Sequence, residues 1–391
     1  MKNGALNTHK LCLISFSLCI IANNTFGSDA KMYIVSKMAM LVFFMISMLD
    51  ILARRELTLK KYLLPMILFV MLEFFSCLWA VDSNISFAQL STQIQLFILF
   101  MFSTSAFKEL GEVKYLYISL YISGFVLLAY SLFVYGPSGY VTMITNGTRL
   151  GGLIANENGF GRVYALAGVG SFFCFLNNKK KLLHGLSTML FLVNVLASGS
   201  RGALVVLVFG IVLSSSVYYG FKNIWKFILI GFVVLLGVYY LLNMSQFAMI
   251  NHRLSGLFGE HREESVLGRQ NMILVGWELF KKHPFWGTGL SSFSVISGFG
   301  TYSHNNYIEV LVSLGIIGFL IYYIPFVTLI VRILQRYGIG KDKNLLVLLM
   351  FLTIYLFYGF FTVQIYVKDF WMLLGCGMAF YSYWPEIDEE G

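Results

Sequence analysis

Residues 304–318 read His-Asn-Asn-Tyr-Ile-Glu-Val-Leu-Val-Ser-Leu-Gly-Ile-Ile-Gly. This stretch predicts that a long apolar helix begins here, with a titratable imidazole and three polar side chains near its start. An α-helix advances about 100° per residue, so we expect Gly315 and Gly318 on one stripe below His304. Glycines in a membrane helix let a neighbouring backbone approach closely. The stretch therefore predicts a packed seam with a reactive group at its upper end; the alternative is a loop histidine that precedes an ordinary membrane helix.

The composition around this stretch is that of a polytopic membrane protein. Of the 391 residues, 58% are hydrophobic and 12% are charged, whereas globular domains carry about 25% charged residues. The net charge of +9 is therefore no argument for nucleic-acid binding; it is interpreted by where the basic residues fall relative to the membrane. The five cysteines lie in apolar stretches without CxxC spacing, which supports neither a disulfide framework nor a zinc site.

Apolar runs predict an all-α fold with about twelve transmembrane helices, forming one integral membrane domain over residues 1–391. The expected spans are 11–26, 32–53, 62–80, 85–106, 115–135, 157–176, 182–198, 202–220, 223–243, 304–331, 344–362 and 367–384. The first could instead be a signal sequence, because Lys2 and Lys10 precede a short apolar run. A clear small-residue cleavage site does not follow, which favours a retained helix.

Basic residues gather in alternate connecting segments, and this predicts the orientation. The positive-inside rule places the segments that hold Arg54 and Arg55, Lys179–Lys181, and Arg332 and Arg336 in the cytoplasm, together with both termini. On the opposite side we expect short loops and one long extracytoplasmic loop over 244–303. That loop breaks the charge pattern, as long loops can, and its segment 269–282 is amphipathic and could lie in the membrane interface.

Three arginines lie near predicted outer helix starts, where free N–H groups and the helix dipole favour anions over cations. Arg201 follows Ser198-Gly199-Ser200, Arg162 lies a turn beyond Asn156-Glu157-Asn158, and Arg269 opens the amphipathic helix. Because a guanidinium can hold phosphate through two nitrogens, this pattern predicts a phosphate-binding site. The alternatives are that Arg201 reaches lipid headgroups, that Asn156 or Asn158 only caps a helix, and that Arg162 pairs with Glu157. Arg149, in the preceding loop, is less informative.

His304 is expected to serve that site as a general base. The positive end of a helix and nearby arginines both lower a histidine pKa, and a neutral imidazole can take a proton from a hydroxyl. Asn305, Asn306 and Glu309 could orient the ring or bind substrate hydroxyls. The long-loop histidines are expected to have no catalytic role; they are His252, His261 and His283.

The segment from His304-Asn305 to Gly315 and Gly318 resembles the outer-face histidine motif of the bacterial O-antigen ligase and polymerase superfamily. Gly268-Arg269, the segment His283-Pro284-Phe285-Trp286-Gly287-Thr288-Gly289 and Ser200-Arg201-Gly202-Ala203 are similar to the same family in order and spacing. The resemblance covers residues 199–318. The N-terminal half is similar only in hydropathy and in Asn156-Glu157-Asn158.

The resemblance implies a membrane-embedded glycosyltransferase that acts on the outer face of the bacterial plasma (inner) membrane. Its donor would be a glycan on undecaprenyl diphosphate, without a nucleotide sugar, a metal or another cofactor, because arginines would neutralise the diphosphate leaving group. The expected catalytic residues are His304, Arg201 and Arg269. The expected substrate-binding residues are Arg162, Asn156, Asn158, Asn305, Asn306 and Glu309.

Within the superfamily, we predict a polymerase that joins lipid-linked repeat units into O-antigen, capsule or exopolysaccharide. A ligase that moves the glycan to a lipid A core or to protein shares the donor chemistry and differs in the acceptor. A polysaccharide flippase or solute transporter is a third hypothesis, but such proteins show inverted repeats and polar groups at the membrane midplane. The expected partners are the lipid-linked donor and glycan acceptor, the bilayer, a flippase and a chain-length regulator.

Overall fold

The computed structural model describes residues 2–54, 63–146, 148–154, 156–229, 231–232, 236 and 264–381. Every regular element in these ranges is a helix. The α-helices are α1 (Lys2–Phe26), α2 (Tyr33–Arg54), α3 (Leu63–Ser76), α4 (Ser83–Ala106), α5 (Lys114–Tyr135), α6 (Pro137–Thr145), α7 (Glu157–Asn177), α8 (Lys181–Ser198), α9 (Arg201–Tyr219), α12 (Glu264–Lys282), α13 (Phe293–Ile296), α14 (Asn306–Gly340), α15 (Lys343–Tyr358) and α16 (Lys368–Tyr381). Two short 3₁₀ helices are η1 (Leu110–Val113) and η2 (Phe221–Asn223).

The chain divides into two compact units, and each is described by itself. Unit 1 comprises Met1–His9, Ile46–Leu110 and Glu263–Gly391, and unit 2 comprises Lys10–Met45 and Gly111–Arg262. The predicted single membrane domain stays a prediction.

Among the described helices, seven are long and apolar enough to cross a membrane. Every predicted span overlaps described α-helical residues, but for 223–243 these are only 224–229, 231–232 and 236, and the rest of that span after residue 223 lies outside the described residues. The prediction of twelve spans is not confirmed, because several helices are short. Helices α3 and α16 have 14 residues and α15 has 16. At 1.5 Å per residue they reach about 21–24 Å, less than the roughly 30 Å of the hydrocarbon core.

Helix starts follow local capping chemistry. The Asp82 side chain accepts hydrogen bonds from Asn84 N (3.0 Å) and Ile85 N (3.1 Å) at the start of α4. Asn156 caps α7, Ser200 caps α9, and Asn305 caps α14 in the same manner. These side chains satisfy amides that have no partner inside the helix.

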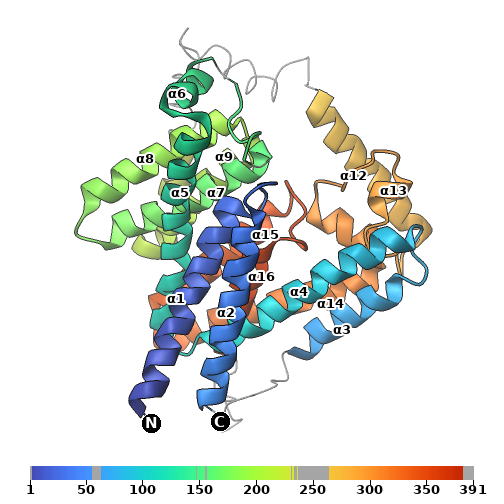
Figure 1. The fold of residues 1–391 in the computed structure, drawn as a ribbon, viewed down its shortest axis with the longest axis horizontal. Helices are drawn as coiled ribbons and strands as arrows, with labels where there is room; N and C mark the ends of the chain where they lie inside the picture. The colour runs from blue at the N-terminus through green and yellow to red at the C-terminus, as the bar shows by residue number, and fades with distance from the viewer. Residues whose placement is uncertain are drawn as a thin grey trace. The chain divides into compact units, whose positions relative to one another are not determined.

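Unit 2 is organised around α7, which packs against α5, α8 and α9 (Figure 1). Small residues make these contacts close. A Cβ added to Gly168 would lie 2.6 Å from a methyl carbon of Leu207 on α9, and one added to Gly170 would lie 2.9 Å from the Tyr117 carbonyl on α5. Glycine at both positions therefore permits the tight packing of the neighbouring helices.

Unit 1 is organised around α14, which packs against α3, α12, α15 and α16, while α4 packs against α16 (Figure 1). Helix α12 contains the predicted amphipathic segment 269–282. Its apolar side chains form a core with those of α13, of Phe299 after α13, and of α14; this cluster comprises Met272, Ile273, Leu279, Phe280, Phe293, Ile296, Phe299, Ile308 and Val312. Much of the apolar side of α12 is thus packed on α14.

The predicted stripe below His304 is wrong for two reasons. Helix α14 begins at Asn306, so His304 lies outside it, and its backbone is left-handed with φ 54°. Helix α14 is also broken at Gly315, where φ is 65° and ψ is −168°. The 100° advance per residue does not apply across either feature. His304 thus lies in a loop before the helix, as the alternative stated, but the helix that follows is broken at Gly315 and is not an ordinary membrane helix.

Candidate functional site

The break in α14 is joined to the loop 284–289, which follows α12. The four backbone hydrogen bonds are Thr288 N to Val312 O (2.8 Å), Gly289 N to Ser313 O (3.0 Å), Ile316 N to Pro284 O (2.8 Å) and Ile317 N to Phe285 O (3.3 Å). In an unbroken helix the amides of 316 and 317 would donate to the carbonyls of 312 and 313. The loop therefore replaces two lost helical bonds with four of its own, as buried irregular backbone in a membrane protein requires.

Gly315 explains why the two segments approach so closely. A Cβ on Gly315 would collide with the carbonyl of Phe285, and a Cβ on Gly287 would lie 2.5 Å from Leu314 N. Both glycines also have positive φ angles, of 65° and 69°, which side chains disfavour. The expectation that Gly315 admits a neighbouring backbone is confirmed, and the neighbour is this loop.

His304 lies in a short turn that Glu309 holds in place. The buried Glu309 carboxylate accepts a hydrogen bond from Ser303 N (2.8 Å), and the Ser303 hydroxyl donates to Asn305 O (2.8 Å). The residues on both sides of His304 are thus fixed by hydrogen bonds. This accounts for a non-glycine residue at φ 54°, a backbone conformation that costs energy and persists where its surroundings impose it.

Asn305 and Asn306 are both engaged within the protein. Asn305 Oδ1 accepts from Tyr307 N (3.0 Å) and Ile308 N (3.1 Å) as the cap of α14. The Asn306 side chain donates to the Tyr323 hydroxyl (2.7 Å) and accepts from the amides of Gln364 (2.7 Å) and Ile365 (2.9 Å). Asn306 therefore ties the start of α14 to the segment before α16. The predicted contacts of these two residues with substrate hydroxyls stay predictions.

The electrostatic environment of His304 keeps its ring neutral at neutral pH. Burial, and secondarily the positive charge of Arg269, lower the His304 pKa from 6.5 to about 4. The imidazole is half-buried, and its centroid lies 4.5 Å from that of Tyr302. Burial also raises the Tyr302 pKa, so this phenol stays protonated. The predicted direction for His304 is confirmed, with burial as the larger cause.

Arg269 reaches this region from the second turn of α12, because that helix begins at Glu264 and not at Arg269. Helix α12 is held close to α14: a Cβ on Gly276 would collide with a methyl group of Ile308. This packing brings the half-buried Arg269 near enough to His304 to influence its pKa. The structure thus brings together a neutral imidazole and a guanidinium, the pair that the sequence predicted for one site.

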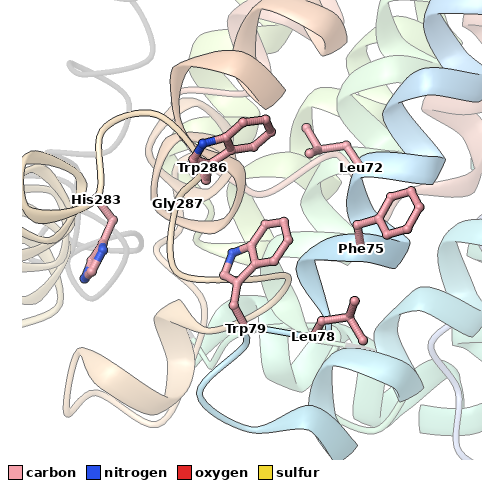
Figure 2. A pocket seen from close by; sticks show the side chains of 7 residues that line it. All are labelled: Leu72, Phe75, Leu78, Trp79, His283, Trp286 and Gly287. Carbon is pink, nitrogen blue, oxygen red and sulfur yellow. The ribbon is translucent and has the colours of Figure 1, made fainter.

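An apolar pocket of about 590 Å³ lies beside the 284–289 loop in unit 1. Figure 2 shows the indole rings of Trp79 and Trp286, whose centroids are 6.4 Å apart at an angle of 77°. Both indoles are exposed, at 41% and 56% of their surface. The lining residues are Leu72, Phe75, Leu78, Trp79, His283, Trp286 and Gly287. In a membrane protein, such a pocket suits a hydrocarbon chain.

The other predicted residues lie in unit 2, where α7 begins against the turn between α8 and α9. Arg201 is the first residue of α9, as predicted, and Asn156 caps α7 by accepting from Gly159 N (2.6 Å). A Cβ on Gly161 would lie 2.5 Å from the Ser198 hydroxyl and 2.8 Å from Ser200 Cβ. Arg162 follows Gly161 directly, so the helix starts that carry Arg162 and Arg201 are neighbours.

Asn158 and Glu157 face Arg149, a residue that the sequence did not single out. The Asn158 side chain accepts from Arg149 Nη2 (3.1 Å), and Glu157 Oε2 lies 4.0 Å from Arg149 Nη1. Among the described residues, no cluster of His, Cys, Asp and Glu side chains is arranged to hold a metal ion. Metal independence stays a prediction.

Residues 186–323 match the protein family described as O-Antigen ligase. This match supports the resemblance of the chain to the O-antigen ligase and polymerase superfamily. Members of this family are glycosyltransferase-like enzymes. No curated protein matches the chain.

The O-antigen ligase region runs from within α8 to Tyr323 in α14. It contains Arg201, Arg269 and the whole His304 turn, including its anchor Glu309, and it ends at the tyrosine that accepts the hydrogen bond of Asn306. Asn156, Asn158 and Arg162 lie before it, so the family match does not bear on them.

Sequence reasoning missed Ser303, Thr288 and Arg149 among the residues that shape these sites. Ser303 anchors the His304 turn, Thr288 bonds to the α14 break, and Arg149 joins α7 to α8. A local signal existed only for Thr288, which lies in the glycine-rich segment that resembles the O-antigen ligase family.

Proposed function

We propose that the protein is a membrane glycosyltransferase that polymerises oligosaccharide repeat units carried on undecaprenyl diphosphate. The match to a family of glycosyltransferase-like enzymes supports this proposal, and the polymerase reaction and its donor go beyond that match. The observation that carries it is the half-buried His304 imidazole, neutral at neutral pH, with the positive charge of Arg269 acting on it.

In the proposed step, the acceptor hydroxyl oxygen attacks the anomeric carbon of the donor glycan. A new glycosidic bond forms, and the bond between that carbon and the diphosphate oxygen breaks. The hydroxyl proton passes to the His304 imidazole, and the electron pair leaves on undecaprenyl diphosphate. The base must be neutral before the step, and a guanidinium stabilises the negative charge that develops on the leaving group.

Arg269 is suited to the second role by its position. It lies on α12, which is fixed against α14 by the packing at Gly276 and connected to the 284–289 loop. The apolar pocket beside that loop supports a donor with a long hydrocarbon chain. The donor contacts proposed for Arg201 and Arg162 rest on the sequence pattern.

The central test uses purified protein and lipid-linked repeat units, with chain extension as the readout. His304→Ala should stay folded and inserted but extend chains about 10²–10⁴-fold more slowly, because proton transfer contributes about that much. His304→Gln retains a hydrogen bond but not a base, and it should be equally slow. The matched control is His261→Ala, a long-loop histidine to which we assign no role. Normal extension by His304→Ala would defeat the assignment.

The same assay tests metal independence. Chelator should leave chain extension unchanged, because arginines provide the positive charge at the leaving group. Activity that is lost on chelation and restored by a divalent cation would contradict this.

Ligase activity is the second candidate, because the matching family is described as O-Antigen ligase. Polymerase and ligase share the donor half of the reaction and differ in the acceptor hydroxyl. Supplying one labelled donor with either a lipid-linked repeat unit or a lipid A core separates them. Product with the repeat unit alone supports the polymerase, and product with the core alone supports the ligase.

The proposed site faces the outside of the bacterial inner membrane, with both termini in the cytoplasm. The support is the positive-inside pattern of the sequence. An impermeant thiol reagent added to whole cells should label Glu263→Cys and not Lys180→Cys. The opposite labelling pattern would reverse the topology and place the site in the cytoplasm.

A further inference from the structure

Arg149 accounts for how the turn before Arg201 is held in unit 2. Helix α8 ends at Ser198, which leaves its last four carbonyl groups without helical partners. All four accept hydrogen bonds: Val195 O from Ser198 Oγ (2.7 Å), Leu196 O from Gly199 N (2.9 Å), Ala197 O from Leu150 N (3.1 Å) and Ser198 O from Arg149 Nε (2.9 Å). Arg149 and Leu150, which are far from α8 in the sequence, thus donate hydrogen bonds to the last two carbonyl groups of this helix.

The Arg149 side chain also covers Gly199, the left-handed residue with φ 62° that ends α8. A Cβ at Gly199 would lie 3.2 Å from Arg149 Nε and 3.3 Å from Arg149 Cγ. Gly199 is two residues before Arg201, and Ser200 between them caps α9. The Arg149 side chain therefore packs against the turn that determines the orientation of the first turn of α9.

The far end of the same side chain holds the start of α7. Arg149 Nη2 donates to Asn158 Oδ1 (3.1 Å), and Nη1 lies 4.0 Å from the Glu157 carboxylate. The close contact of Gly161 with Ser198 and Ser200 lies one helical turn further along α7. One planar guanidinium thus joins the α8 end to the α7 start.

We propose that Arg149 is a positioning residue that places Arg201 and the start of α7 for glycosyl transfer. Its Nε and Nη2 groups donate to protein acceptors and its charge faces Glu157, which is the bonding of a structural link rather than of a phosphate ligand. Lysine cannot replace it, because a single ammonium group cannot reproduce the planar fork that spans two acceptors. The catalytic part of this inference rests on the proposed function, and the placement of Arg201 does not.

The first experiment measures placement without activity. The five native cysteines are free and buried, so a thiol introduced by Arg201→Cys in purified protein reports its own accessibility to a maleimide. Adding Arg149→Gln should change its labelling rate about tenfold or more, because two hydrogen bonds to a charged group are lost. Lys222→Cys, exposed beyond the far end of α9, is the matched control and should label at the same rate in both backgrounds. Equal rates at position 201 would overturn the inference.

The second experiment is a double-mutant cycle on chain extension. Arg149→Gln and Arg149→Lys should each lower kcat by about tenfold or more. Either change should lower kcat little further when it is combined with Arg201→Ala, because the effects of substitutions at two residues are not additive when one residue acts through the other. Losses that multiply would show that Arg149 acts independently of Arg201 and would overturn the catalytic part.

One outcome separates this inference from the proposed function, and a second variant provides a test if the first does not fold. Full activity of Arg201→Ala would remove the role proposed for Arg201, while the labelling experiment would still decide its placement. If Arg149→Gln does not fold, Asn158→Ala removes one of the two bonds and keeps the arginine. It should change labelling at position 201 in the same direction, and an unchanged rate would count against the inference.

Discussion

The pH dependence of glycan transfer should reveal the lowered pKa of His304. Burial, and then the charge of Arg269, lower this pKa from 6.5 to about 4. Because the neutral imidazole is the form that accepts a proton, His304 should still act as a general base in weak acid. At pH 5 about 90% of the rings would be neutral, against about 3% for a histidine at the ordinary pKa of about 6.5.

The assay is kcat/KM for lipid-linked donor between about pH 4 and pH 8, since this quantity reports groups of the free enzyme. We expect kcat/KM to fall on the acid side of the profile with an apparent pKa of about 4, and we call this fall the acid limb. Arg269→Gln removes the positive charge and should move the limb upward, but not to 6.5, because burial is the larger cause and persists. Arg269→Lys retains the charge and should leave the limb where it is. The residual activity of His304→Gln should lack this limb.

An acid limb near 6.5 in the wild-type protein would refute the reasoning, as would a limb that His304→Gln leaves in place. Stability gives an independent check. The folded-state pKa lies below the unfolded one, so the unfolded chain binds the proton first as the pH falls. His304 should therefore reduce stability progressively from about pH 6.5 to about pH 4, with no further change below. This decline should be absent in His304→Gln.

Substitutions at three positions, Gly315, Arg269 and Glu309, test the surrounding structure. Gly315→Ala places a Cβ against a backbone oxygen at φ 65° and should lower thermal stability and protein yield, whereas Gly338→Ala, with open space in the same helix, should be neutral; equal melting temperatures would contradict the packing at the break. Arg269→Ala and Arg269→Lys should each slow transfer by about 10²–10³-fold, and a wild-type rate for the alanine variant would exclude Arg269 from the site. Glu309→Gln retains an oxygen for Ser303 N and should stay active, whereas Glu309→Ala leaves that amide unsatisfied at a cost of about 1–3 kcal/mol and should lower kcat; equal kcat values would refute this anchoring.

The sequence predicted helix starts well where the deciding chemistry is local. Asn156 and Ser200 each bond an amide three residues later, so α7 and α9 begin where the sequence places them. It also predicted the direction of the His304 pKa shift. The predicted stripe below His304 failed, because a periodicity argument assumes a continuous helix and the loop 284–289 interrupts α14 at Gly315.

The sequence by itself predicted an α-helical membrane protein, and it singled out the segments that resemble the O-antigen ligase family. Apolar content is a property of the composition, and helix capping depends on residues a few positions apart, so both can be recognised in the sequence without knowledge of the fold. Only the tertiary structure decided that Asn306 joins residues 58 and 59 positions away and that Arg149 bonds to a carbonyl 49 positions away. Such hydrogen bonds depend on which helix ends come into contact when the chain folds, and a local pattern of residues does not specify those contacts.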